Sequence, residues 1–186
     1  KDSDGYGKNL LDDSDINGVN SFAYRGLIEF DLNELNILLN VHGATIDSPT
    51  GSFSPLGATV DGITPCSISA IEAKQCVDIL GYQAPSDPYK GYYNWVQNTD
   101  LDSTGGYVQL IYDFSSFTLT AISSYDEVDR ILFEETDGSP SSLFHAVYGV
   151  ESETFQQEMR LSGQTEKLTW LAGAYYLTED LTQDQS

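Results

Sequence analysis

Four aromatic residues close together in the sequence are the first candidates for contact with a ligand. They are Tyr89, Tyr92, Tyr93 and Trp95, within a stretch rich in Gly, Pro and Ser. Aromatic faces on a loop can stack on sugars, on aromatic rings or on bound cations. The competing interpretation is that these rings only pack the loop together. The sequence therefore predicts a site for a small molecule or a glycan here, and both interpretations stay open.

Two further groups of side chains have chemistry of their own. Cys66 and Cys76 are the two cysteines of the chain, and their short spacing predicts one disulfide formed in an oxidising compartment, with two reduced thiols as the alternative. Two acidic groups offer oxygen ligands for Ca²⁺. They are Asp100 with Asp102, and Glu134 and Glu135 with Asp137. Neither group matches a complete calcium loop, so we expect no cofactor, with Ca²⁺ as the less favoured possibility.

The remaining residues show no catalytic constellation. Neither a nucleophile-elbow spacing nor a Gly-rich phosphate loop after a strand occurs in the sequence. We therefore do not expect an enzyme.

The charge of the chain argues against nucleic acid as a partner. The formal net charge is −21 and only eight residues are Lys or Arg, whereas phosphate binding needs clustered cations. An acidic, solvated surface explains this charge, and a vestibule that attracts cations is the alternative. The sequence contains no run of about 18 apolar residues, as a membrane-spanning helix requires, but strands of a membrane barrel need only about 9–11 residues.

Six segments alternate polar and apolar residues with the period of a β-strand. They are 21–32, 37–47, 105–114, 117–128, 154–162 and 168–177. Short turns at Asn33, Ser115 and Gly163 join them into three hairpins. One side of these strands carries polar residues that we expect to face the lumen of a barrel, either as a hydrogen-bonded wall or as a solute path. They are Arg25, Glu29, His42, Glu158 and Arg160.

Long connections separate the three hairpins. The longest is predicted at 48–104 and the next at about 130–150, and the ends of the chain, 1–20 and 179–186, are polar and acidic. A short helix is predicted at 67–80, with Ser69 and Glu72 at capping-box spacing and with Cys76 inside the helix. Short turns at one end and long loops at the other are typical of an antiparallel, up-and-down transmembrane β-barrel.

Aromatic residues gather toward the predicted strand ends, as in the interfacial girdles of membrane barrels. They are Tyr24, Phe30, Tyr112, Phe114, Phe117, Tyr125, Trp170 and Tyr176. Ordinary enrichment of aromatic residues in strands is the alternative for any one of them.

Several of these segments resemble the barrel of TonB-dependent outer-membrane receptors. They are Phe155-Gln-Gln-Glu-Met-Arg-Leu-Ser162, Leu168-Thr-Trp-Leu-Ala-Gly-Ala-Tyr-Tyr-Leu-Thr-Glu-Asp180, Phe117-Thr-Leu-Thr-Ala-Ile-Ser-Ser-Tyr125, and Asp4-Gly-Tyr-Gly-Lys-Asn9 with Phe22-Ala-Tyr-Arg-Gly-Leu27. The resemblance covers most of the chain except about 48–104. It implies a bacterial outer-membrane protein that binds a ligand at extracellular loops and imports it with energy supplied by the TonB complex.

The resemblance also implies parts that this sequence does not contain. A plug domain and the remaining barrel strands are expected, with the plug and first strands preceding Lys1, so residues 1–186 are predicted to be one portion of a larger barrel in the outer-membrane lipid. Two other functions compete. One is a secreted, soluble β domain that binds carbohydrate and buries Phe22, Ile28 and Phe30 in a core. The other is a passive porin-type barrel.

Overall fold

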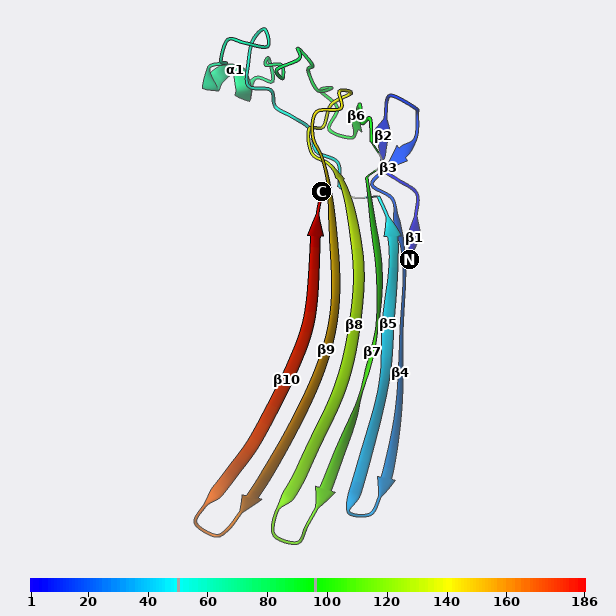
Figure 1. Cartoon of the computed structure of the whole chain (residues 1–186), viewed down its shortest axis with the longest axis vertical. Helices are drawn as coiled ribbons and strands as arrows, with labels where there is room; N and C mark the ends of the chain where they lie inside the picture. Colours follow the sequence, from blue (N-terminus) through cyan, green and yellow to red (C-terminus); the bar gives the residue numbers. More distant parts are fainter. Residues whose placement is uncertain (50, 96) are drawn as a thin grey trace.

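Six long antiparallel strands dominate the structure, a computed structural model that describes residues 1–49, 51–95 and 97–186 (Figure 1). They are β4 (Val19–Leu32), β5 (Leu35–Ser48), β7 (Asn98–Asp113), β8 (Thr118–Glu135), β9 (His145–Gln164) and β10 (Thr169–Gln185). Each strand pairs with the next one along the chain. The prediction of an all-β, antiparallel, up-and-down sheet made of three hairpins is therefore confirmed.

Shorter elements lie at one end of this sheet (Figure 1). Strand β1 (Asp2–Ser3) pairs with the start of β4 and so extends the large sheet by one strand. A second, three-stranded sheet consists of β2 (Gly7–Asn9), β3 (Asp15–Ile16) and β6 (Lys90–Gly91). Because β2 pairs with both β3 and β6, this small sheet joins the start of the chain to the long connection after β5. That connection also contains the helix α1 (Ile68–Glu72).

The connections between the long strands are short at one end of the sheet and long at the other, as the sequence predicts (Figure 1). Asn33 and Glu34 form the turn between β4 and β5, and Asn33 adopts a φ of 56°. Asn tolerates this left-handed conformation better than most residues, which explains its place in a tight turn. The long connections 49–97 and 136–144 both lie at the opposite end.

The register gives the sheet two chemically different faces. Side chains alternate between the faces along each strand, and directly paired residues share a face. Arg25 pairs with His42, and the same row continues through Gly105 to Asp126. We name this side the polar face. The alternate residues of each strand, such as Ile28 on β4, point to the opposite side, which we name the apolar face.

The half of the apolar face nearest the short turns carries no charged side chain. We name this part the apolar band. Its members are Gly26, Ile28, Phe30, Leu32, Leu35, Ile37, Leu39, Val41, Gly106, Val108, Leu110, Tyr112, Leu119, Ala121, Ser123, Tyr125, Phe155, Gln157, Met159, Leu161, Ala172, Ala174, Tyr176 and Thr178.

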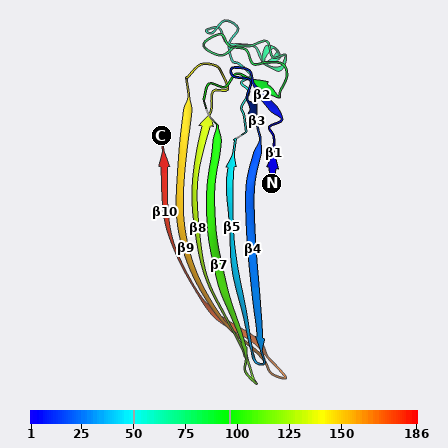
Figure 2. The same ribbon diagram turned by 90° about the vertical axis from the view of Figure 1, so that its right-hand side faces the viewer.

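The long strands form one curved layer rather than a closed, packed domain (Figure 2). Within the described residues the large sheet is open, with β1 and β4 at one edge and β10 at the other. Ile28 is 56% exposed and Leu171 is 69% exposed, so nothing in the described part of the chain covers these side chains. The most buried apolar side chains, Cys76, Tyr93 and Ala146, all lie toward the loop end.

Four strands extend further than the sequence predicts. Strand β7 begins at Asn98, β8 continues to Glu135, and β9 begins at His145. Asp, Asn and Glu are frequent in these extensions and are poor strand formers, so the sequence pattern predicts loops there. The backbone ladders with the neighbouring strands hold these residues extended nevertheless. The predicted loops 48–104 and 130–150 shorten accordingly to 49–97 and 136–144, and the predicted acidic tail 179–186 is mostly the end of β10.

The predicted helix is shorter than expected and has a different cap. Ser67 is its N-cap, and the Ser67 hydroxyl accepts a hydrogen bond from the backbone N–H of Ala70 at 3.2 Å. The helix ends at Glu72, with Ala73 as its C-cap, because Lys74 adopts a φ of 53°, which turns the chain. Cys76 therefore lies after the helix and not inside it, and the predicted capping box of Ser69 and Glu72 is wrong.

The turn predicted at Gly163 is also displaced. Gly163 belongs to β9 and pairs with Trp170, and the connection to β10 comprises residues 165–168. A Cβ atom at position 163 would lie 2.7 Å from the Trp170 ring. Glycine is therefore present at this position because the indole lies across it, and not because the chain turns there.

Candidate functional site

The polar side chains predicted to line a lumen all lie on the polar face, but they do not form a single cluster. Arg25 lies directly opposite His42 across β4 and β5. Glu158 and Arg160 form an ion pair along β9, with Nε and Oε1 2.6 Å apart. Glu29 accepts a hydrogen bond from the Asn36 amide at 2.7 Å. These contacts are separate from one another, and both interpretations of this face, a hydrogen-bonded wall and a solute path, stay predictions.

His42 makes two side-chain contacts on this face. Its Nδ1 lies 2.6 Å from Oδ1 of Asn40, and its Nε2 lies 2.9 Å from Oδ1 of Asp126. Asp126 is two strands away from His42, on β8, and Gly105 of β7 lies between them. A Cβ atom on Gly105 would lie 2.2 Å from Oδ1 of Asp126. The missing side chain at Gly105 therefore makes room for this contact across β7.

At the loop end, a reciprocal hydrogen bond joins two distant parts of the chain. The buried amide of Asn9 donates to the backbone carbonyl of Tyr93 at 2.9 Å, and its oxygen accepts from the N–H of Tyr93 at 3.0 Å. The same segments pair as β2 and β6. Together these contacts fix the residues after β2 beside the final part of the long connection.

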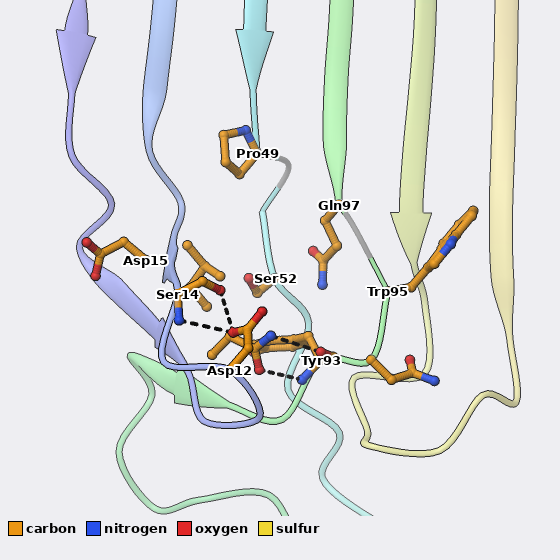
Figure 3. Close-up of a pocket in the computed structure, with 11 residues that line it drawn as sticks. Asp12, Ser14, Asp15, Pro49, Ser52, Tyr93, Trp95 and Gln97 are labelled. Atoms are coloured by element: carbon orange, nitrogen blue, oxygen red, sulfur yellow. Dashed lines mark hydrogen bonds between the residues drawn. The ribbon is translucent and has the colours of Figure 1, made fainter.

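A cavity of about 260 Å³ lies between these two segments (Figure 3). Its lining includes three carboxamides, two carboxylates and two aromatic rings. The lining residues are Asn9, Asp12, Ser14, Asp15, Ile16, Pro49, Ser52, Tyr93, Asn94, Trp95 and Gln97. We name this cavity the loop pocket. Its walls come from the β2–β3 connection and from both ends of the connection between β5 and β7.

The four aromatic residues predicted to contact a ligand are dispersed. Only Tyr93 and Trp95 line the loop pocket. Tyr89 packs edge-on against Tyr6 with ring centroids 5.9 Å apart, and Tyr92 packs in the same way against Tyr82 at 6.2 Å.

The ring of Trp95 already has a stacking partner. It lies on His145 with centroids 4.5 Å apart, and Figure 3 shows it directed toward β8 and β9, at the edge of the pocket. Burial raises the pKa of the Tyr93 hydroxyl, and burial raises that of Tyr82 to about 12. These contacts match the packing interpretation better than a shared stacking platform.

A pair of carboxyl groups, of which Glu135 is buried and Asp137 half-buried, lies beside the loop pocket. The Glu135 side chain is fully buried and accepts a hydrogen bond from the N–H of Gly138 at 3.0 Å. Burial, followed by its hydrogen bond to Asp137, raises the pKa of Glu135 to about 8. Burial also acts to raise the pKa of Asp137, but hydrogen bonds from Ser139 and Glu135 and from backbone N–H groups hold it below its ordinary value. The shared proton therefore resides on Glu135.

The acidic residues considered for calcium lie in two places. Asp100 and Asp102 belong to β7, where they pair with Asp47 and Asp129 on the apolar face beyond the apolar band. Glu134 belongs to β8, on the opposite face from Glu135. Among the described residues, no group of three or more His, Cys, Asp or Glu side chains is arranged to hold a metal ion.

The predicted disulfide is confirmed. Cys66 and Cys76 are bonded, with Cα atoms 6.3 Å apart, and Cys76 is buried. The bond closes the segment that contains α1. Backbone hydrogen bonds between Thr59, which precedes Cys66, and Val77, which follows Cys76, also join the two ends of this segment.

Sequence reasoning missed several residues of these contacts. Asp126 gives a detectable signal, because it lies in a segment with the alternation of a β-strand. The pairing of β8 with β9 then places it on the same face as Glu158. Asn9, Asp12 and Gln97 give none, because only the pairing of β2 with β6 brings segments separated by about 80 positions together.

Comparison of the chain with known protein families, with curated proteins and with solved structures finds no match. In the described part of the chain, no helix has the length and apolar character needed to cross a membrane.

Proposed function

We propose that this chain forms part of the β-barrel of a TonB-dependent receptor in a bacterial outer membrane. In this proposal the receptor binds a small-molecule or glycan ligand at its extracellular loops. Barrel strands and a plug outside residues 1–186 complete it, and the TonB complex supplies the energy for uptake. The observation that carries the proposal is the apolar band, which is exposed although it is the most apolar surface of the sheet.

On β4 the height of the uncharged surface matches a membrane. On the apolar face of β4, uncharged residues extend from Phe22 to Leu32, which spans ~34 Å at ~3.4 Å per residue. A strand tilt of about 40° reduces this length to a height of ~26 Å, close to the ~25 Å apolar zone of outer-membrane barrels. A soluble sheet of this size would need a second layer to cover the same surface.

Aromatic residues support the same placement. Near the short turns, Phe114 stacks on Phe117 with centroids 4.4 Å apart and lies 4.5 Å from Tyr112. Near the opposite border of the apolar band lie Tyr125 and its direct partner Phe155. Two aromatic girdles separated by an apolar zone are typical of transmembrane barrels.

A pair of adjacent positions on β4 tests membrane insertion directly. Ile28 lies in the apolar band and Leu27 on the polar face, and the two side chains are 56% and 54% exposed. The native cysteines are bonded to each other, so the Ile28→Cys and Leu27→Cys variants of the complete protein can each be labelled with a fluorophore. We expect brominated lipid to quench the label at position 28 strongly and the label at position 27 weakly.

The two other functions predict different results. A secreted, soluble β domain that binds carbohydrate would remain in solution without detergent, and brominated lipid would quench neither label. Strong quenching at position 27 with weak quenching at position 28 would invert the faces and contradict the proposal. A passive porin gives the same quenching as a receptor, so energy coupling needs a separate measurement.

A further inference from the structure

We propose that the loop pocket binds a small solute that carries a protonated amine, and this assignment rests on the proposed role of the loops in ligand capture. The pocket lies between the β2–β3 connection and the connection that precedes β7 (Figure 3). Its volume of about 260 Å³ suits a solute of one sugar ring or less rather than a large chelate.

The two carboxylates of the pocket lining, Asp12 and Asp15, can only accept hydrogen bonds. Oδ1 of Asp12 accepts two bonds from Ser14, from the N–H at 3.0 Å and from the hydroxyl at 2.6 Å. Oδ2 of Asp12 has no hydrogen-bond partner among the described residues. These two bonds, led by the one from the Ser14 hydroxyl, lower the pKa of Asp12, so this carboxylate is ionised at neutral pH.

A second acceptor belongs to Gln97, a half-buried residue of the pocket lining. Oε1 of Gln97 is buried and has no hydrogen-bond partner among the described residues. The other end of this amide donates to the Glu135 carboxyl group at 3.4 Å. A buried acceptor without a partner is costly, and an occupant that donates a hydrogen bond removes that cost.

The charge of the pocket is negative and belongs mainly to Asp12. The Asp15 carboxylate is neutralised by Lys8, whose Nζ lies 2.8 Å from Oδ1 of Asp15. No cation pairs with Asp12 in the described residues, and because Asp12 is exposed, only solvent compensates its charge. An anionic solute would be repelled, and an apolar solute would leave the Gln97 oxygen without a donor. An ammonium group supplies both a positive charge and donors.

A divalent metal ion fits the pocket less well than an amine. No group of three or more acidic, His or Cys ligands comes together in the described part of the chain. The lining instead mixes hydroxyls, amides and isolated carboxylates, which suits a solute with several donors spread over its surface.

The two tryptophans of the chain provide a direct assay. Trp95 lines the loop pocket, whereas Trp170 lies at the far end of the sheet beside a short turn (Figure 1). In a Trp170→Phe background of the complete protein, the fluorescence of Trp95 reports the pocket alone if other parts of the protein contribute a constant signal. Three probes of one size, titrated at about pH 6, differ in charge: glucosamine, glucose and glucuronate.

Adjacent aspartates give a matched pair of variants. Asp12 lines the pocket, whereas the side chain of Asp13 is 92% exposed and does not line it. Asp12→Asn keeps an oxygen for the Ser14 bonds and removes the charge. Asp13→Asn places Asn at a φ of 60°, where Asn is well tolerated. We expect Asp12→Asn to weaken glucosamine binding about tenfold and Asp13→Asn to leave it within about twofold.

Each result decides the proposal. Saturable binding of glucosamine that exceeds that of glucose and glucuronate, and that Asp12→Asn reduces, supports an amine site. Equal binding of the three probes, binding of glucuronate, an equal loss in both variants, or no binding at all overturns it. The lipid-quenching experiment is independent. If the pocket does not bind glucosamine but lipid quenches the label at position 28, the amine site alone is refuted. If the pocket binds glucosamine but the protein stays in solution, the receptor alone is refuted.

Discussion

Glu135 is the single residue with the clearest dependence on pH. Its pKa is raised to about 8, first by burial and then by the hydrogen bond to Asp137, whereas an unfolded Glu has a pKa of about 4.3. The folded loop therefore holds a proton that the unfolded chain releases. This contribution to stability is complete below about pH 4.3 and is lost as the pH rises through about 8.

We expect the connection 136–144 to loosen near pH 8 for this reason. Deprotonation places a negative charge on the buried Glu135 carboxyl group beside the Asp137 carboxylate, and the two charges repel each other. Trp95 packs on His145, the direct partner of Glu135 in the β8–β9 ladder, so its fluorescence in the Trp170→Phe background should change with a midpoint of about 8. In Glu135→Gln the change should disappear. The same transition in both proteins would assign it to another group.

At the scale of strands, the border of the apolar band predicts the inclination that the sheet takes in the proposed membrane setting. The first charged residue beyond the band on each strand is Asp47, Asp102, Glu127, Glu153 and Asp180, from β5 to β10. The register shows that this border descends by four residues across four strand spacings. At ~3.4 Å per residue and ~4.8 Å per strand this slope is ~35°, within the tilt of barrel strands.

Polarised infrared spectroscopy of the protein in oriented lipid films measures that inclination. We expect the amide I dichroism to report a mean strand tilt of about 35–40° from the membrane normal. Strands parallel to the normal, or lying in the membrane plane, would show that the charged border does not follow the lipid surface.

The comparison of sequence with structure is also clearest at the strand scale. The alternation of Phe22 to Leu32 and of Phe155 to Leu161 predicts their strands and faces. Successive side chains of a strand point to opposite faces, so an apolar face and a polar face give a period of two residues. The extensions around Asp100, Asp129 and Glu151 have no such pattern, because apolar residues such as Ile131 and Leu132, and charged residues such as Asp129 and Arg130, occur on both faces. Only the backbone ladder with neighbouring strands defines them.

The candidate site is less predictable than the strands that support it. Tyr93 and Trp95 are found from composition, and only these two of the four aromatic candidates reach the pocket. Asp12 and Gln97 lie far apart in the sequence and have no shared pattern. Their proximity depends on the parallel pairing of β2 with β6, which no local sequence signal specifies.

At the scale of the whole molecule, energy coupling separates the proposed receptor from a passive barrel. In cells that produce the complete protein, we expect uptake of its ligand to fall to background when a protonophore collapses the inner-membrane potential or when TonB is removed. Binding at the cell surface should persist under both treatments. Uptake that continues unchanged would identify a porin-type barrel, and a solute of general porins serves as the control for cell integrity.

The two-faced register has a further consequence for how this protein can change over evolutionary time. Inserting or deleting one residue within a long strand moves every following side chain to the other face, so Ile28 and its neighbours would exchange places with Arg25 and Glu29. Length changes in the strands are therefore tolerated only in pairs. The connections 49–97 and 136–144 can change in length by any number of residues without moving strand side chains to the other face. Related proteins should accumulate single-residue insertions at the end that holds the loop pocket, where a new ligand preference can arise without disturbing the sheet.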